Sequence, residues 1–328
     1  MSDKVCNVNN IYKLDGRVPV IKAIPFGIQH ILAMFVANLT PITIIAAAGG
    51  LTQDEIAILL QNAMFVAGIA TLIQLYPVWK VGSRLPIVMG VSFTFVTVLS
   101  TVAVNYGYPA VIGAVLVGGI FEGTLGLLAK YWRKIISPIV AASVVTAIGF
   151  SLFTVGARSF GGGYVDDFGS AENLLLGTIT LVVCLAWNCM AKGYLKQLSV
   201  LVGLVVGYIV AIFMGKVDLS VVFADGLVAF PKLLPYKPEF NMGAIFSVCI
   251  IYLVSAAETI GDTTAMVASG LNREITDKEI AGSLACDGYS SAISSLFGCP
   301  PVTSFSQNVG LIAMTKVVNR FTIMTGAM

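Results

Sequence analysis

Long apolar segments separated by short polar connections dominate the chain from residue 23 onward. A helix needs about 20 mostly apolar residues to cross roughly 30 Å of hydrocarbon, so each segment of that length is a candidate span. The pattern predicts an all-α polytopic membrane protein with ten such spans in this chain. They are residues 23–46, 55–76, 85–104, 109–129, 136–156, 172–190, 197–214, 241–262, 279–297 and 300–318.

The third and tenth segments do not have the pattern of a continuous helix. The third begins RLPIVMGVSFTFV and the tenth begins CPPVTSFSQNVG, so in both a proline precedes a β-branched stretch that contains Ser-Phe. Such a stretch leaves backbone groups unpaired, which is tolerated at membrane depth only inside protein or beside a cavity. A matched pair of interrupted segments in two halves is typical of inverted-repeat transporters and marks the binding site.

The spacing of the two broken segments also predicts the length of the repeat. If the third span corresponds to the tenth, the repeat is seven spans long, and an odd number of spans inverts the second copy. Two full repeats need fourteen spans, whereas this sequence supplies about ten. We therefore expect the chain to be a fragment that lacks about four spans of the second repeat.

Composition supports a membrane protein, and the distribution of charge gives an orientation. The 328 residues are 57% hydrophobic and 11% charged, whereas soluble domains are roughly 25% charged. Fifteen of the 19 Lys and Arg residues fall on one side of the alternating spans and four on the other. Because cytoplasmic loops carry the excess of Lys and Arg, we expect a multi-pass protein of the cytoplasmic (inner or plasma) membrane with its N-terminus in the cytoplasm.

Motifs of soluble enzymes are absent from the sequence. No GxxxxGK[ST], GxGxxG or HExxH pattern occurs, and His30 is the only histidine. We therefore expect no enzyme, no metal and no cofactor, and nothing in the sequence points to nucleic acid. An ion gradient is the expected driving force.

Glu258 and Asp262 are the first candidates for chemistry within the spans. An ionisable side chain at a helix centre costs roughly 2.5–3.5 kcal/mol on insertion, so such residues are functional candidates. The two acids are four residues apart and share one helix face. Two close carboxylates in a low-dielectric site repel each other, so the pair can exchange a proton near neutral pH. Hydration of Asp262 at the cytoplasmic end of its span is the alternative.

Gln307 and Asn308 precede VGLIAMTK, a run that predicts a short half-helix. A Gln amide offers a donor and an acceptor side by side, which matches the C(=O)–N–H edge of a nucleobase. Glu258 would accept ring N–H groups on the other side, and Phe93 would either cover the planar ring or belong to the core. Asn308 or Ser306 could instead cap the free N–H groups of the half-helix.

Three further ionisable residues each leave two interpretations open. His30 either bridges helices through hydrogen bonds or organises the site and relays protons. Glu122 lies among the glycines of VGGIFEGTLG, which allow close helix packing, and a buried neutral acid is the favoured interpretation. Asp287 opens the ninth span, where it either positions neighbouring spans or shuttles a proton.

The stretches GIQHILAMF, ETIGD and SQNVGLIAMTK resemble motifs of the nucleobase–ascorbate transporter family, also called nucleobase:cation symporter-2. This family holds xanthine, uric acid and uracil permeases. The last stretch fills the family signature with Gln307, Asn308, Gly310, Thr315 and Lys316. The resemblance implies fourteen spans in two inverted repeats, short strands in spans 3 and 10, and a core domain that slides against a gate domain, usually in a homodimer.

The resemblance also implies a division of this chain into parts. A cytoplasmic segment would be followed by core spans 1–4, gate spans 5–7 and core spans 8–10, with the remainder of the second repeat absent. The corresponding ranges are 1–22, 23–130, 131–240 and 241–320.

The roles of individual residues follow from the same resemblance. Glu258 and Gln307 would bind the base, with Phe93, or alternatively Phe95, as the aromatic of span 3. The binding set would be completed by Ser306 and Asn308, and proton coupling and site organisation would fall to Asp262, Asp287 and His30.

The resemblance favours one branch of the family. Uracil permeases resemble a pattern with Glu in place of Gln307 and His in place of Asp262, and this chain departs from it at both positions. We therefore expect a secondary active transporter for proton-coupled uptake of purine nucleobases, namely xanthine, uric acid or both, in the lipid bilayer. The alternatives are a uracil permease of the same family and an anion transporter of the same fold.

Overall fold

A computed structural model describes residues 7–132, 138–163, 167–217 and 230–328 of the protein. These residues form helices and one short pair of strands. The helices are η2 (Val8–Tyr12), α1 (Val20–Ala48), α2 (Gln53–Leu75), η3 (Phe93–Phe95), α3 (Val96–Tyr106), α4 (Tyr108–Leu127), α5 (Ala129–Trp132), α6 (Pro138–Phe160), α7 (Ala171–Met190), α8 (Tyr194–Gln197), α9 (Ser199–Phe213), α10 (Met242–Met266), η6 (Val267–Leu271), α11 (Asp277–Leu296), α12 (Ser306–Thr315) and α13 (Arg320–Ala327). The strands are β1 (Met89–Val91) and β2 (Val302–Ser304).

Six helical segments in the described part of the chain are long and apolar enough to cross a membrane. They are α1, α2, α4, α7, residues 142–160 of α6, and the continuous segment 242–271 formed by α10 and η6. Shorter apolar helices occupy residues 93–106 and 199–213. The prediction of a mostly helical membrane fold is therefore confirmed, whereas the exact number of spans and the inverted repeat stay predictions.

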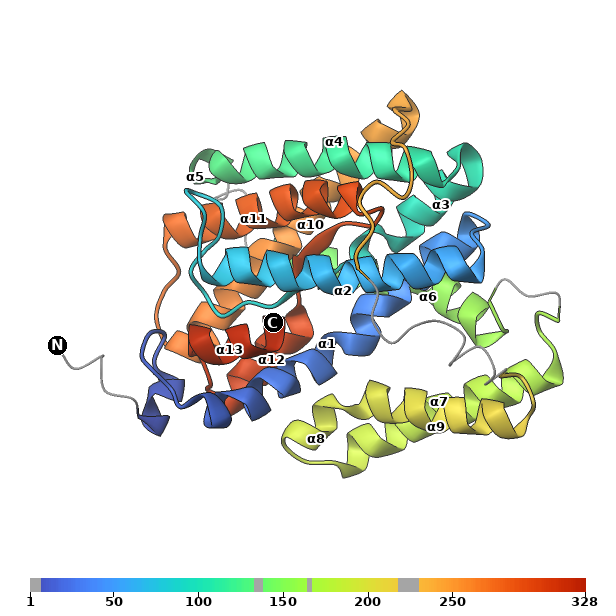
Figure 1. Cartoon of the computed structure of the whole chain (residues 1–328), viewed down its shortest axis with the longest axis horizontal. Coiled ribbons are helices and arrows are strands. Elements are labelled where there is room, and N and C mark those ends of the chain that lie inside the picture. Colours follow the sequence, from blue (N-terminus) through green and yellow to red (C-terminus); the bar gives the residue numbers. More distant parts are fainter. Residues whose placement is uncertain (1–6, 133–137, 164–166, 218–229) are drawn as a thin grey trace.

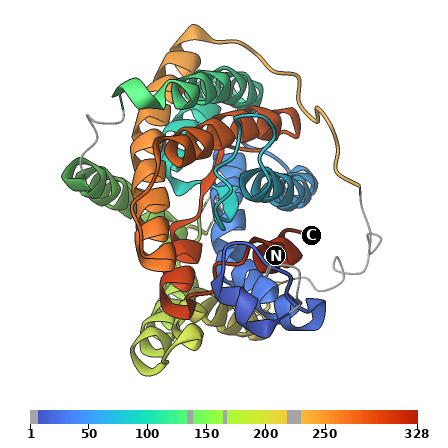
Figure 2. The same ribbon diagram turned by 90° about the vertical axis from the view of Figure 1, so that its left-hand side faces the viewer.

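The helices form two groups (Figures 1 and 2). The first, which we call the strand-bearing bundle, contains α1–α4 and α10–α13 together with both strands. Its main core joins residues of α1, α2, α3 and α10, such as Ile42, Leu59, Leu99 and Tyr252. The second group, the outer helices, consists of α7 and α9 together with α6, which also packs against α10 and α3 of the bundle. In Figure 1, α7 and α9 lie side by side below α1, and the two helices contact each other.

Two helices of the strand-bearing bundle begin with the same local device. Thr52 caps α2 and Thr276 caps α11, and in each case a Glu three residues later returns a hydrogen bond to the backbone N–H of the cap. This capping box satisfies two backbone donors that the first helical turn leaves free. The capping box therefore fixes the residue at which each of the two helices begins.

Glycines let α4 and α11 pack backbone to backbone. A Cβ atom built on Gly288 would lie 2.0 Å from the backbone nitrogen of Gly123, so no side chain fits between the two helices at this point. Glu122, next to Gly123, is only 1% exposed. The expectation that glycines allow close packing around Glu122 is therefore confirmed.

The N-terminal segment is fastened to the start of α13. The side-chain nitrogen of Asn319 lies 3.1 Å from each of the backbone carbonyl oxygens of Asn10, Lys13 and Gly16, which share its two N–H donors. Arg320 pairs with Asp15, and its guanidinium also donates to the carbonyl of Leu75 at 2.8 Å. These contacts join the two ends of the described chain to the end of α2.

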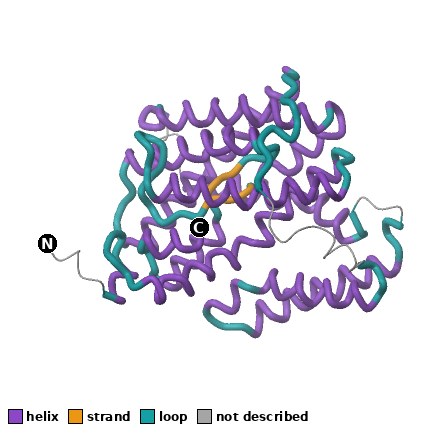
Figure 3. Tube along the Cα trace, viewed as in Figure 1, coloured by secondary structure: helices purple, strands orange, loops and turns teal. Residues whose placement is uncertain are grey.

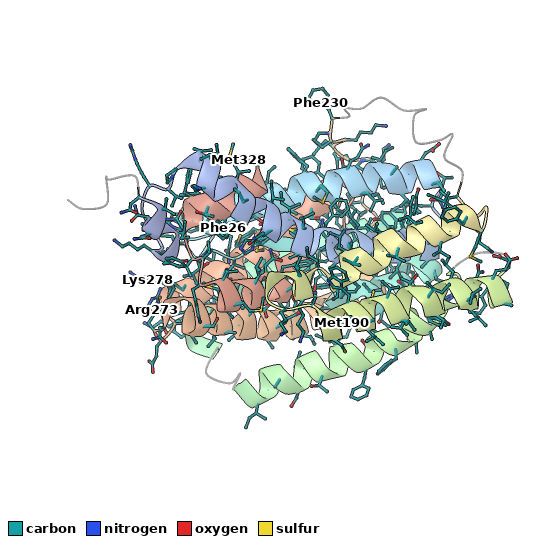
Figure 4. The ribbon with its side chains drawn as sticks, turned by 90° about the horizontal axis from the view of Figure 1, so that it is seen from below. Phe26, Met190, Phe230, Arg273, Lys278 and Met328 are labelled. Atoms are coloured by element: carbon teal, nitrogen blue, oxygen red, sulfur yellow. The ribbon has the colours of Figure 1, made fainter. Side chains whose placement is uncertain are left out.

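Connections that the charge pattern assigns to one side of the membrane gather at one end of the molecule. In Figure 1 the N-terminal segment, the loop after α2, α5 and the loop before α11 lie at the left. Figure 4 labels Arg273 and Lys278 at this same end. The grouping agrees with the alternation of spans, and the assignment of this end to the cytoplasm stays a prediction.

Candidate functional site

The two strands cross the middle of the strand-bearing bundle (Figure 3). They are antiparallel, and their register pairs Met89 with Ser304, Gly90 with Thr303 and Val91 with Val302. The prediction of short strands in the two broken spans is thus confirmed. All six strand residues are buried, so this non-helical backbone lies inside protein, as its depth in a membrane requires.

Side chains from α1 and α2 satisfy the backbone of β1. The hydroxyl of Thr71 accepts a hydrogen bond from the N–H of Met89 at 2.9 Å. The amide oxygen of Asn38 accepts one from the N–H of Val91 at 2.7 Å. An unpaired buried N–H costs about 1–3 kcal/mol, so these two polar side chains stabilise the break in the third span.

Side chains from α11 likewise form hydrogen bonds with the backbone of β2. Ser291 accepts from the N–H of Val302 at 3.1 Å and donates to its carbonyl at 3.0 Å. Asp287 accepts from the N–H of Ser304 at 3.4 Å and from the hydroxyl of Thr259. Asp287 is fully buried, and its contacts tie α11 to β2 and to α10.

Glu258 meets the turn that follows β1. Its carboxylate accepts a hydrogen bond from the hydroxyl of Thr94 in η3. The neighbouring Phe93 is partly exposed. Phe95 is fully buried, and its ring packs against that of Tyr252 with centroids 4.7 Å apart. Of the two aromatic candidates, Phe93 packs against the core but keeps part of its surface exposed, while Phe95 lies wholly inside the core.

Asp262 lies one helical turn after Glu258 and binds the segment between β2 and α12. Its carboxylate accepts hydrogen bonds from the hydroxyls of Ser304 at 3.0 Å and Ser306 at 2.8 Å. Ser304 thus contacts Asp262 through its side chain and Asp287 through its backbone. Glu258 thus binds the third span and Asp262 binds the tenth, so α10 connects the two broken spans.

The first turn of α12 presents Gln307 and Asn308 in opposite ways. Gln307 is exposed, and within the described chain its side chain has no hydrogen-bond partner. Asn308 is 1% exposed, and its amide nitrogen lies 3.0 Å from both the ring Nδ1 and the backbone carbonyl of His30. The helix starts at Ser306 without a side-chain cap, so capping by Asn308 or Ser306 is not found.

His30 lies in the first half of α1 and connects this helix to α12. The ring is 2% exposed, and it borders a small cavity of about 250 Å³ between α1, α2 and α13. Since Asn308 bonds to His30 rather than to its own helix end, the amide fixes α12 relative to α1. The geometry matches the bridging interpretation of His30.

Sequence reasoning did not single out several of these partners. They are Asn38, Thr71, Thr94, Thr259, Ser291 and Ser304. The only signal was that an Asn and several hydroxyl residues occur inside apolar spans, where a polar group must find a partner. Such residues are frequent in helices, so the sequence alone does not say which of them reach the strands.

The site is suited to holding a small polar molecule. Two carboxylates, an amide with free donors and acceptors, and a partly exposed aromatic ring lie where α10, η3 and α12 meet. Among the described residues, no group of three His, Cys, Asp or Glu side chains is arranged to hold a metal ion. The arrangement supplies hydrogen bonds, negative charge and an aromatic face.

Comparison with known proteins gives the same picture. A family model described as a permease family matches residues 21–328. The chain is 36% identical over 318 residues to a putative purine permease of Clostridium perfringens, covering 97% of this chain and 70% of that protein. It is 35% identical over 328 residues to the xanthine permease XanQ of Escherichia coli, covering 95% and 70%. It is 32% identical over 314 residues to the uric acid permease PucJ of Bacillus subtilis, covering 93% and 69%.

A solved structure supports the fold. The transmembrane domain of the cyanobacterial bicarbonate transporter BicA superposes with a TM-score of 0.65 at 16% identity, covering 94% of this chain and 80% of that one. At this identity the likeness concerns the fold alone. The expectations of a transporter rather than an enzyme, and of an integral membrane protein, are confirmed by the permease relatives and the apolar helices. The chain therefore belongs to the permease family that these xanthine and uric acid permeases represent.

Proposed function

We propose that the protein is a secondary active transporter that takes up purine nucleobases, xanthine or uric acid, across the cytoplasmic membrane. The observation that carries the proposal is that two acids of α10 bind the paired breaks of the third and tenth spans, Glu258 at Thr94 and Asp262 at Ser304 and Ser306. Glu258 is held by Thr94 after β1, and Gln307 follows Ser306, which contacts Asp262 of the same helix as Glu258. A ligand lying here would contact both broken spans at once.

The chemistry of the two residues suits an oxopurine. The amide of Gln307 can donate to a ring carbonyl and accept from the adjacent ring N–H, while the carboxylate of Glu258 accepts N–H groups from the opposite edge. Phe93 would cover the ring face. Ser306 would adjoin the base, and Asn308 would act from beneath the site by holding α12 against His30. The relatives named for xanthine and uric acid support this substrate class.

Proton coupling is proposed for Asp262, with Asp287 and His30 as its partners in organising the site. Ser304 contacts both Asp262 and Asp287, so a change of charge on Asp262 would alter the hydrogen bonds that hold β2 in place. Binding of the base beside Glu258 and protonation of Asp262 would then be linked, because the two acids share one face of α10. A proton gradient would drive uptake through this linkage.

The architecture proposed for the whole transporter follows the pairing of the broken spans. Residues 23–130 and 241–320 would form the core domain and 131–240 part of the gate domain of an inverted repeat of seven spans, working as a homodimer. Residues 1–22 would lie in the cytoplasm. The contact between β1 and β2 and the separation of α7 and α9 from the strands support this division.

Uptake of radiolabelled xanthine in cells that express the full chain tests the proposal. The assay is competed with uric acid, guanine and uracil, at two external pH values and with a protonophore. We expect competition by uric acid, little competition by uracil, and loss of uptake when the proton gradient is collapsed. Uptake that uracil suppresses as well as xanthine does would contradict the substrate assignment, and uptake indifferent to the protonophore would contradict the coupling.

A further inference from the structure

One face of α3 carries polar side chains that the proposed substrate site does not use. Thr97, Ser100, Thr101 and Asn105 follow one another at helical spacing. The opposite face is apolar and buried, with Val96, Leu99, Val102 and Ala103 at most 3% exposed. A helix inside a membrane with one polar face is expected to turn that face toward a cavity or a partner.

That face of α3 borders a cavity of about 700 Å³. The other walls come from the end of α1 and the end of α6, including Thr43, Val155 and Arg158. Neither Glu258 nor Gln307 lines it, so the cavity is separate from the proposed substrate site. Thr97 follows Phe93 by four residues, which places the cavity about one helical turn, or ~5.4 Å, beyond the site. Its volume lies within the range of roughly 300–1,000 Å³ that is usual for small-molecule sites.

Two hydroxyls in the cavity wall lack a hydrogen-bond partner in the part of the chain that the structure describes. The side-chain oxygens of Thr97 and Ser100 are buried and have no hydrogen-bond partner among the described residues. The hydroxyl of Thr101, by contrast, donates a hydrogen bond to the backbone carbonyl of Thr97 at 2.9 Å. Buried polar groups without a partner are rare, and each calls for an explanation such as a bound ligand. Rotation about χ1 would turn either hydroxyl into the cavity.

We propose that this cavity is an outer vestibule with a second binding site for the nucleobase, held through the hydroxyls of Thr97 and Ser100. The proposal rests on the function proposed above. A hydroxyl both donates and accepts, so two of them one helical turn apart suit the alternating carbonyl and N–H groups on the edge of an oxopurine. Val155 and Ile44 provide apolar walls for the ring.

Arg158 gives the vestibule its charge. Among the described residues that line the cavity, it is the only charged one. A guanidinium has five N–H donors, so Arg158 can serve a ligand carbonyl in addition to a protein partner. A positive wall attracts acidic oxopurines, which carry partial or full negative charge, and the charge pattern assigns Arg158 to the outer side of the membrane. The vestibule would thus collect the base before it passes Phe93.

Cysteine protection tests the vestibule independently of the substrate site. In the full chain, Thr101→Cys is labelled from outside with a membrane-impermeant maleimide, after native cysteines that react have been replaced and the buried Cys286 and Cys299 retained. We expect xanthine, but not ribose, to slow labelling both with Glu258 intact and with Glu258→Gln. Lys237→Cys, on an exposed connection, is the control whose labelling xanthine should not change.

The outcomes separate the two proposals. If xanthine protects Thr101→Cys only when Glu258 is intact, or not at all while uptake is normal, the second binding site is refuted. If the wild-type chain takes up no purine, the proposed function itself fails.

A double substitution tests whether the hydroxyls of Thr97 and Ser100 hold the base. Thr97→Val combined with Ser100→Ala keeps the shape of α3 but removes both groups, and we expect the xanthine concentration for half-protection to rise about three- to tenfold. Thr97→Ser keeps a hydroxyl and should leave that concentration unchanged. An equal rise for Thr97→Ser, or none for the double variant, would overturn the role of these side chains.

Discussion

Helices α4 and α7 are both 20 residues long and of similar hydropathy. In α4, 61% of an apolar stretch of 18 residues is buried inside the protein, whereas in α7 the share is only 6%. The strand-bearing bundle, to which α4 belongs, encloses Glu122, Asp287, His30 and the residues that hold the strands. The outer helices expose large apolar side chains such as Phe153 and Leu185.

The comparison teaches what apolarity means in a membrane protein. Lipid is as apolar as a protein core, so hydropathy alone does not separate a lipid-facing or subunit-facing helix from a buried one. The difference lies in the polar residues, because a polar group in the membrane must be paired inside the protein. We therefore expect identical substitutions to have large effects in the strand-bearing bundle and small effects in the outer helices.

The largest difference is expected for the removal of one carboxylate. Glu258→Gln should lower the rate of xanthine uptake by about 100-fold or more. Hydrogen bonds to a charged group contribute about 1.5–3 kcal/mol, and the proposed proton coupling is lost together with them. Radiolabelled uptake, normalised to the amount of protein in the membrane, measures this.

Glu172→Gln at the start of α7 is the matched control. Glu172 forms an exposed ion pair with Lys216 at 3.3 Å, and such pairs contribute little. Uptake with unchanged apparent affinity in Glu258→Gln would remove Glu258 from the proposed site.

The second largest difference between the strand-bearing bundle and the outer helices is expected when a glycine is replaced by alanine, which adds one methyl group. Gly288→Ala places a Cβ atom 2.0 Å from the backbone of Gly123, so α4 and α11 must move apart. We expect a loss of about 1–3 kcal/mol in the free energy of unfolding, seen as a lower melting temperature of the purified protein in detergent.

Gly149→Ala in α6 is the same change with no atom within 4 Å of the new methyl group. It should be neutral or stabilising, because Ala favours a helix over Gly by up to about 1 kcal/mol. Equal melting temperatures for the two variants would mean that α4 and α11 are not in backbone contact.

Removal of an amide is expected to have a comparable or smaller effect. Asn38→Leu leaves the N–H of Val91 without its partner, which should destabilise the protein by about 1–3 kcal/mol and lower uptake by disturbing β1. Thermal unfolding and uptake of the same preparation measure both consequences.

Asn188→Leu in α7 replaces an exposed amide and should change neither quantity. A stable, fully active Asn38→Leu variant would show that β1 does not need the side chain of α1.

The smallest expected effect is a change of preference at Gln307. Gln307→Glu removes the donor half of the amide, so xanthine binding should weaken by about five- to tenfold and competition by other bases should rise relative to it. A competition profile measured in the uptake assay reports the shift.

Gln61→Glu, at an exposed position of α2, is the control and should leave the profile unaltered. An unaltered profile for Gln307→Glu would count against a role for this residue in reading the base.

The broken spans were predictable because their polarity conflicts with a membrane helix. Proline and hydroxyl residues at the start of spans 3 and 10 indicated breaks in the helices, the family resemblance implied strands there, and the structure has β1 and β2 at these places. The spacing of Glu258 and Asp262 likewise put both acids on one face of α10, toward η3 and α12 respectively.

The hydrogen-bond partners were not predictable in the same way. Asn308 looked like a helix cap, but its partner is His30, which lies 278 residues away in the sequence. Long-range pairing of this kind depends on how the helices pack, and neither periodicity nor propensity carries that information. The same holds for Asn38 and Ser291, whose side chains serve strands in other parts of the chain.

The pairing of β1 with β2 also sets an order of events during synthesis. β1 leaves the ribosome about 200 residues before β2, which at roughly 5–20 residues per second is a delay of some tens of seconds. During this interval Gly90 faces no strand, and the N–H groups of Met89 and Val91 have only Thr71 and Asn38. The third span is therefore incomplete until the tenth has been made. In a nascent chain arrested before residue 300, Val91→Cys should react with thiol reagents, whereas in the finished chain, where Val91 is fully buried, it should not.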